Sequence, residues 1–256
     1  MKKFLILTLM LLTVLSASAK VVSSARDSQG VKFGVRGSLA LSTMNQEEDI
    51  VVASWDEWSD VSLKPLSALA LGFAWNIPVL ESFHFNIELK YEIKGDKIIA
   101  KEDFSKKVHR WNRIGYWEVP IQPQLRLKIS EKTHLNVNFG PYIAVAMLGK
   151  AKEKTHVATR KDYTIKLDMF SGRYYEKTEG EKREWSNAKD DFEPWFSRLD
   201  VGLALGVDYQ IENFHVGVSY DLGLKDINAF ARDQKNDAGY TPIKNRTALF
   251  TLGFDF

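Results

Sequence analysis

The stretch from Arg198 to Lys225 constrains the fold more than any other part of the sequence, because apolar residues recur at every second position. From Leu199 to Tyr209 the odd-numbered residues are apolar, and the residues between them are small or charged. After a break at residues 211–213, the alternation resumes on the even-numbered residues from Phe214 to Leu224. A period of two indicates β-strands, and two such runs joined by a short break predict an antiparallel hairpin.

The second face of this hairpin indicates where the strands lie. It carries glycines and scattered charges of both signs, such as Gly206, Asp208, Gly217 and Asp221. That composition suits the lumen of a small barrel whose apolar exterior meets lipid. The alternative is the core of a water-soluble sandwich, in which the apolar face would point inward.

Alternation of the same kind recurs along the chain and predicts eight strands. They cover approximately residues 32–43, 64–76, 83–94, 116–129, 133–148, 198–211, 214–225 and 245–256. Outer-membrane barrels have an even number of strands, and eight is the smallest common number. The pattern therefore predicts an all-β fold, an eight-stranded antiparallel up-and-down transmembrane β-barrel. Closure of the barrel would pair every strand edge, as lipid requires.

The connections between these strands alternate in length. Those after strands two, four and six are short, and the others are long and polar, including 95–115 and 149–194. Outer-membrane barrels have short periplasmic turns and long extracellular loops, so we expect both termini in the periplasm. Tyr163 to Met169 alternates enough to extend a hairpin above the membrane. Pro120 and Pro123 predict a local bulge, because proline has no backbone N–H to donate to the neighbouring strand.

The N-terminus predicts export. Lys2 and Lys3 precede an apolar run that ends in an A-x-A site at residues 17–19. We therefore expect a signal peptide over 1–19, a periplasmic N-terminal segment over 20–31 and the barrel domain over 32–256. The apolar run is too short for a membrane-spanning helix. The predicted location is the bacterial outer membrane.

The charge of the mature chain points to no polyanionic partner. Removal of Lys2 and Lys3 leaves 33 of the 35 basic residues, equal to the 33 acidic ones. We therefore expect no nucleic-acid binding. The chain has no cysteine, which excludes disulfides and cysteine-ligated metals. We expect a monomer without cofactors.

Charged residues on the predicted inward faces make the lumen the first candidate site. The main ones are Arg36, Glu88, Lys90, Glu118, Arg126, Arg198, Asp200 and Asp221. The interior of an eight-stranded barrel is just wide enough for side chains, and buried charges must be paired or hydrated. We therefore expect a filled polar lumen, with a small porin as the alternative.

Three histidines are a speculative metal site. His84, His134 and His215 each fall on an inward face near the periplasmic mouth. Imidazoles at similar depth could bind zinc or respond to pH. Their strands are not neighbours, however, so we favour separate histidines that hydrogen-bond to carboxylates or water.

A lipid-modifying barrel enzyme is a further alternative. His109 and His156 lie in predicted external loops, with Ser105, Asp162 and Ser171 near them in sequence. No nucleophile motif surrounds these residues, and spacing alone does not establish a triad. We expect no enzymatic activity.

External loops are the most plausible interaction surface. Trp55 and Trp58 lie in an acidic segment, where they could bind a protein partner or could lie on the barrel rim at the lipid headgroups. The expected function is a structural or loop-mediated interaction role in the envelope.

Six segments together resemble the PorT-like family of outer-membrane β-barrel proteins of Bacteroidota-type bacteria. They are FGVRGSLALSTM, YWEVPIQPQLRLKI, GPYIAVAMLGK, LDVGLALGVDYQI, VGVSYDLGLKDI and LFTLGFDF. The resemblance implies an eight-stranded barrel among outer-membrane lipids, placed there by the barrel-insertion machinery with Phe256 as part of the assembly signal. It also implies an alternative function, an accessory role in protein secretion or translocation.

Overall fold

A computed structural model of the chain describes most of the predicted barrel. The described residues are 30–45, 60–102, 106–157, 162–171, 174–178, 181–185, 196–229 and 242–256. The predicted signal peptide and most of residues 20–31 lie outside these ranges, as do Trp55, Trp58 and Ser105. No helix in the described part of the chain is long and apolar enough to cross a membrane.

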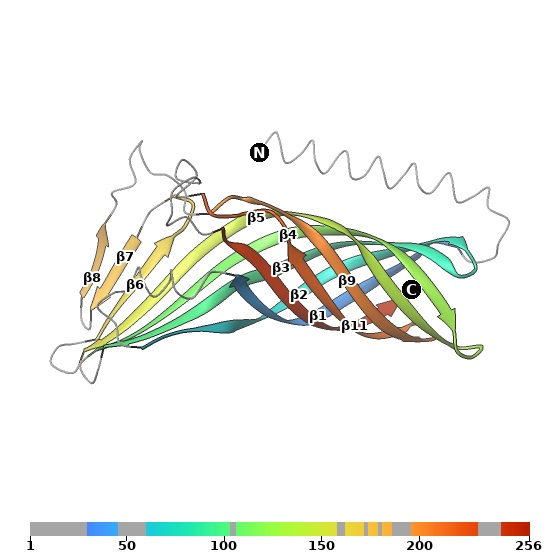
Figure 1. Cartoon of the computed structure of the whole chain (residues 1–256), viewed down its shortest axis with the longest axis horizontal. Helices are drawn as coiled ribbons and strands as arrows, with labels where there is room; N and C mark the ends of the chain where they lie inside the picture. Colours follow the sequence, from blue (N-terminus) through green and yellow to red (C-terminus); the bar gives the residue numbers. More distant parts are fainter. Residues whose placement is uncertain are drawn as a thin grey trace.

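The described residues form one antiparallel sheet of eleven strands. The strands are β1 (Lys32–Asn45), β2 (Asp60–Leu80), β3 (Phe83–Glu102), β4 (Lys106–Lys128), β5 (Thr133–Val157), β6 (Tyr163–Asp168), β7 (Tyr174–Thr178), β8 (Glu181–Trp185), β9 (Leu199–Ile211), β10 (Phe214–Gly223) and β11 (Lys244–Asp255). Strands β6, β7 and β8 continue the sheet from β5 and lie at one end of the molecule (Figure 1).

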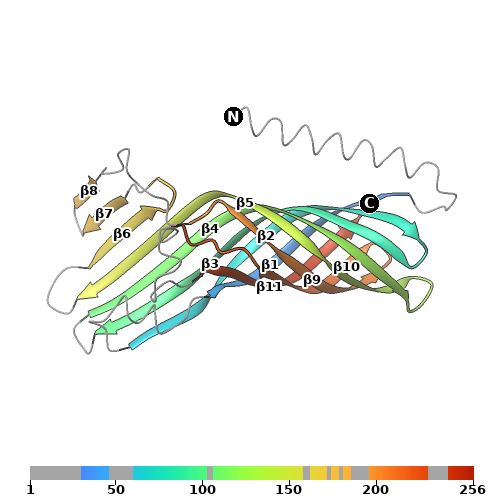
Figure 2. The same cartoon turned by 45° about the horizontal axis from the view of Figure 1, so that its top comes forward.

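The other eight strands close into a ring. Their order is β4-β3-β2-β1-β11-β10-β9-β5, and an additional pairing of β4 with β5 closes the circuit. The first and last strands pair in register from Gly34 opposite Asp255 to Asn45 opposite Lys244. Figure 2 shows the resulting cylinder of tilted strands. The predicted eight-stranded antiparallel barrel is therefore confirmed.

Short turns and the C-terminus share one end of the cylinder, which we call the periplasmic end. The turns lie between Leu80 and Phe83, between Lys128 and Thr133, and between Ile211 and Phe214. Glu212 in the last turn has a positive φ of 51°. The backbone N–H of Phe256 donates to the carbonyl of Phe33 at 2.7 Å, which fixes the chain end beside the first strand.

At the opposite, external end the strands continue further than the sequence pattern predicted. Residues 95–115 were expected to form a loop, and this expectation is wrong: β3 and β4 pair from Gly95 opposite Arg113 to Glu102 opposite Lys106. The alternation does persist there, because Ile98 and Ala100 are buried. β5 likewise extends to Val157 and pairs with β6 inside the predicted 149–194 loop.

The two prolines of β4 cause no register shift. Pro120 pairs with Tyr142 of β5, and the register beyond Pro123 is unchanged, with Gln124 opposite Asn138. The irregularity of this strand pair lies instead between Gly115 and Tyr116. The predicted bulge at the prolines is therefore wrong. Pro120 pairs only with β5 and Pro123 only with β3, so each missing N–H falls where the strand has a partner on one side, and no extra residue is needed.

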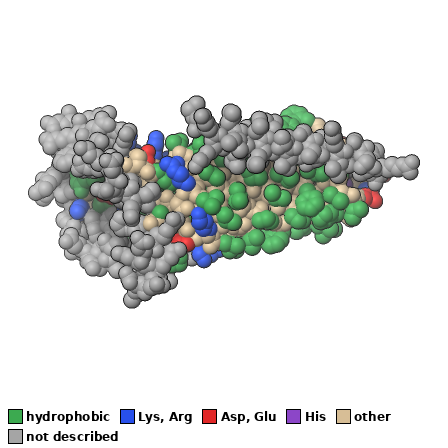
Figure 3. Space-filling model, turned by 90° about the horizontal axis from the view of Figure 1, so that it is seen from above, with side chains coloured by type: hydrophobic (Ala, Val, Ile, Leu, Met, Phe, Trp, Pro, Cys, Tyr) green, Lys and Arg blue, Asp and Glu red, His purple; other side chains and the backbone are tan. Residues whose placement is uncertain are grey.

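The two surfaces of the cylinder differ as the alternation predicts. Outward-facing apolar side chains are exposed, with Leu69 at 70% and Leu71 at 68%. Figure 3 shows hydrophobic side chains over most of the visible cylinder wall. Aromatic rings cluster at the periplasmic rim, where Phe33 stacks on Phe256, and Tyr91 packs against Trp117 nearer the external end.

Candidate functional site in the barrel lumen

The periplasmic layer of the lumen consists of Arg36, Asp208, His215 and Asp255. Arg36 Nη2 donates to Asp255 Oδ1 at 2.7 Å. His215 contacts two carboxylates, with Nε2 at 2.8 Å from Asp255 Oδ2 and Nδ1 at 3.0 Å from Asp208 Oδ1. A Cβ at Gly253 would lie 2.5 Å from Arg36 Cδ, so glycine makes room for the guanidinium. Both imidazole nitrogens can donate to carboxylates only in the protonated ring.

The other two histidines have separate partners. His84 Nδ1 lies 2.5 Å from Asn76 Oδ1, and Asn76 in turn hydrogen-bonds to Gln124. Arg126 Nη2 lies 3.1 Å from His134 Nδ1. The structure therefore does not bring the three predicted histidines together.

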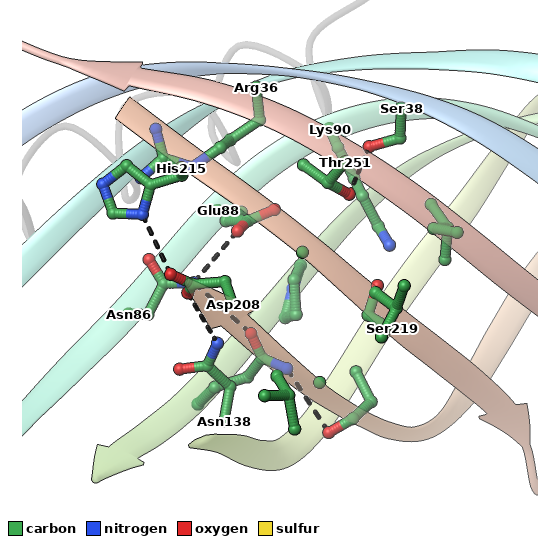
Figure 4. A pocket seen from close by; sticks show the side chains of 18 of the residues that line it. Arg36, Ser38, Asn86, Glu88, Lys90, Asn138, Asp208, His215, Ser219 and Thr251 are labelled. Carbon is green, nitrogen blue, oxygen red and sulfur yellow. Dashed lines mark hydrogen bonds and ion pairs between the residues drawn. The ribbon is translucent and has the colours of Figure 1, made fainter. Parts of the chain in front are cut away.

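A cavity of about 60 Å³ lies above the periplasmic layer. Figure 4 shows polar side chains converging on it from several strands. Asn86 Nδ2 donates to Glu88 Oε1 at 2.9 Å, and the hydroxyls of Ser38 and Thr251 are 2.7 Å apart. A polar space of this size has room for a few ordered waters.

An ion-pair network fills the lumen on the external side of this cavity. Lys90 Nζ lies 2.6 Å from Asp221 Oδ2, 2.9 Å from Glu118 Oε1 and 3.2 Å from Glu92 Oε2. Lys94 Nζ lies 2.5 Å from Glu118 Oε2 and 3.8 Å from Asp200 Oδ2. All six side chains are buried. We call these six residues the lumen network.

Aromatic and amide groups complete the network. The Tyr142 hydroxyl donates to Asp200 Oδ2 at 3.1 Å, and Asn245 Nδ2 donates to the same oxygen at 2.9 Å. Lys94 Nζ also lies 4.3 Å from the centre of the Tyr142 ring, within cation–π range. Buried ions are held only where such additional contacts replace water.

The lumen network also contains three carboxylates that, within the described residues, are close enough together to hold a metal ion. Ligand atoms of Glu92, Glu118 and Asp221 lie within 4.8 Å of one another. Lys90 Nζ contacts all three carboxylates, so the ammonium stands where a cation would be bound. The three carboxylates therefore share one ammonium, and both carboxylate oxygens of Glu92 are buried without a hydrogen-bond partner among the described residues.

An apolar cluster covers the network on its external side. It includes Ile114, Met169, Phe170, Phe196 and Ile227, which are buried together with Tyr116 and Tyr142. Phe170 and Met169 follow β6, and Phe196 precedes β9, so residues from the external connections contribute to it. Closely packed apolar side chains therefore separate the network from the external end of the described barrel.

Seven of the eight predicted lumen charges lie on the inward side of the barrel. Lys90, Glu118, Asp200 and Asp221 belong to the lumen network, and the remaining three are Arg36, Glu88 and Arg126.

The placement predicted for Arg198 is wrong. Arg198 immediately precedes β9, and its carbonyl accepts from the Ala146 N–H at 2.6 Å, but its side chain is exposed and does not lie among the buried lumen charges. Its guanidinium lies 4.1 Å from the centre of the Phe170 ring.

Sequence reasoning placed two network members, Glu92 and Lys94, on the inward face but did not include them among the main candidate charges. It also did not single out Tyr142, which hydrogen-bonds to the network. Lys94 and Glu92 share the parity of Lys90 on β3, and Tyr142 alternates with the outward Phe139 and Ile143 across a single proline. Alternation along a strand therefore finds the inward face, but it does not rank the residues on that face. The contacts that join them come from different strands, and no spacing within one strand predicts those contacts.

The external histidines are not arranged as a catalytic group. His109 stacks on Trp111 with ring centres 5.8 Å apart. His156 Nδ1 lies 2.6 Å from Asp162 Oδ1 in an exposed pair. No hydrogen bond within the described ranges joins a serine hydroxyl to either ring.

The closed ring, the apolar exterior and the ionic lumen define a transmembrane β-barrel. The outer membrane protein beta-barrel domain family matches residues 22–229, and the chain belongs to this family. Its location is the bacterial outer membrane. No match was found among curated proteins.

Several solved outer-membrane proteins are similar to the chain at low identity. The attachment invasion locus protein Ail of Yersinia pestis is 13% identical, with 89% of this chain and 100% of Ail covered and a TM-score of 0.37. OprG of Pseudomonas aeruginosa is 12% identical, with 89% and 97% covered and a TM-score of 0.34. These similarities are too distant to carry over a function.

Proposed function

We propose that this protein is a sealed outer-membrane barrel, neither a conducting pore nor an enzyme, with a structural or interaction role at its external end. The observation that carries the proposal is the lumen network, in which Lys90 and Lys94 bridge four buried carboxylates across the lumen. The distances between the lysine Nζ atoms and the carboxylate oxygens of the network are 2.5–3.8 Å. An ion crossing the barrel would have to break these pairs.

Planar bilayer recording tests whether ions can pass through the lumen. Full-length protein reconstituted in concentrated KCl should give no stable current steps, because both the network and the apolar cluster obstruct the lumen. Folding is checked on the same sample by its β-sheet circular dichroism. Reproducible ohmic steps from folded protein would contradict the proposal and would favour the small porin.

The strands beyond the level of Tyr91 and Trp117 support an interaction role. We call this part, which consists of the outer ends of β3, β4 and β5 together with β6, the external extension. β3, β4 and β5 continue beyond the outer aromatic pair of Tyr91 and Trp117, and β6 adds a further strand to this sheet. Such a sheet offers a surface outside the membrane that the barrel does not need for closure. A protein partner would bind here, and we propose a monomeric barrel as its anchor.

An accessory role in secretion is the second candidate, and it rests on the PorT-like resemblance. The segments that carry it lie on β1, β4, β5, β9, β10 and β11, which all belong to the barrel wall. Deletion of the gene should then block export of a secreted protein while leaving the outer membrane intact. Unchanged export in the deletion strain would contradict this role.

A further inference from the structure

The external extension carries a concentrated set of cations on its outward face. They are Arg113 of β4, Lys150, Lys152 and Lys154 of β5, and Lys166 of β6, and we call them the basic strip. Together with Trp111 they line a cavity of about 680 Å³. Arg113, Lys150, Lys152, Lys154 and Lys166 are all exposed.

Strand register places like charges directly opposite one another in this strip. Arg113 pairs with Lys150, and Lys152 pairs with Lys166. Like charges opposite each other on neighbouring strands destabilise a sheet. Burial, followed by the neighbouring Lys154, Lys166 and Arg113, lowers the pKa of Lys152. The arrangement is therefore unfavourable for the fold alone and would be relieved by a bound anion.

One carboxylate in the described residues lies within the strip. Asp168 lines the same cavity and pairs opposite Lys150, while its Oδ1 accepts the backbone N–H groups of Phe170 and Ser171, each at 3.0 Å. It offsets one of the five cations, and the register of the described strands places no carboxylate opposite the other four. Glu153 alternates onto the opposite side of β5 and accepts from Thr155 at 3.5 Å.

The position of the strip indicates which anion reaches it. Lys150 lies two residues beyond the exposed Leu148 of the apolar wall, or about 7 Å along the strand. Trp111 lies in the same face, with Lys97 Nζ 5.4 Å from its ring centre. Tryptophan is enriched at the level of lipid headgroups. On the face seen in Figure 3, Lys and Arg side chains begin where the hydrophobic wall ends.

We propose that the basic strip binds the phosphate groups of a phosphorylated lipid headgroup whose acyl chains lie against the apolar wall below. The strip faces away from the barrel axis and borders the membrane, so a lipid reaches the cations and the wall at once. A soluble anion would gain only the cations. The inference goes beyond the proposed function, because it requires neither a sealed lumen nor a protein partner.

Native mass spectrometry of the full-length barrel in nonionic detergent tests this site, with diphosphoryl lipid A as the probe. Lys152→Gln with Lys166→Gln removes two facing cations and should weaken binding about 30-fold. The matched control is Lys244→Gln with Arg246→Gln, which removes the same charge from the outward face of β11 and should leave the affinity unchanged. A large excess of inorganic phosphate should not displace the lipid.

Three outcomes would overturn the proposal. The first is absence of lipid A binding by folded wild-type protein. The second is equal weakening by the control pair, which would indicate attraction by net charge alone. The third is displacement by inorganic phosphate at comparable affinity, which would identify a soluble-anion site. None of them bears on conductance, so this test and the bilayer recording fail independently.

Discussion

Lys90 is the residue on which the lumen network depends most. Its ammonium contacts three carboxylates, and all of them are buried. Removing one partner of a buried ion pair costs far more than the pair itself contributes, because the remaining charges stay desolvated.

The variant Lys90→Met should therefore unfold far more readily than wild type. We expect a loss of about 3–5 kcal/mol in the free energy of unfolding, measured by urea titration in detergent. Lys90→Met combined with Asp221→Asn should recover part of it, since one uncompensated charge is removed. The control Lys132→Met removes an exposed lysine of a periplasmic turn and should have little effect. Equal stability of the two single variants would show that the network does not stabilise the barrel.

At the scale of elements, the extension of β3 and β4 contains an unusual carboxyl group. Asp96 faces inward, is buried, and accepts a hydrogen bond from Asn112 Nδ2 at 2.7 Å. Burial raises the pKa of Asp96 to about 6, and the Asn112 hydrogen bond and Arg110 oppose the shift. Because this folded-state pKa lies above that of the unfolded chain, folding favours the protonated form.

The resulting stability should be present below pH 4 and should be lost as the pH rises from about 4 to 6. Asp96→Asn does not titrate, so the variant should become more stable relative to wild type across this window, by no more than about 3 kcal/mol. Urea unfolding at a series of pH values measures the difference. Glu131→Gln, in an exposed turn, is the control. A pH-independent difference between wild type and Asp96→Asn would contradict the account.

Sequence reasoning predicted the elements of the wall better than their ends. Alternation over Phe83–Lys94 identified β3, because one face meets lipid and the other the lumen. It ended β3 at Lys94 and began a loop at Gly95, because the residues that follow are mainly polar. Yet Ile98, Ala100 and Val108 continue the inward face and are buried. Strand pairing outside the membrane depends on contacts between β3 and β4 that neither strand displays alone.

For the whole molecule, the order of strands followed from the sequence and the interior contacts did not. Eight alternating segments and alternate loop lengths suffice to specify an up-and-down ring. The contact between Lys90 of β3 and Asp221 of β10 joins residues 131 positions apart. Parity places both side chains inward, but only barrel closure with its particular stagger brings them to the same depth.

The central claim is that apolar side chains face lipid while the polar ones face a closed interior. The chain has no cysteine, so single-cysteine spin labels can be placed without background. In lipid bilayers, a label at Leu71→Cys should collide freely with dissolved oxygen and rarely with a water-soluble nickel complex. A label at Ser219→Cys, beside the lumen cavity, should be shielded from both. A Leu71 label that meets the nickel complex more readily than oxygen would contradict the account.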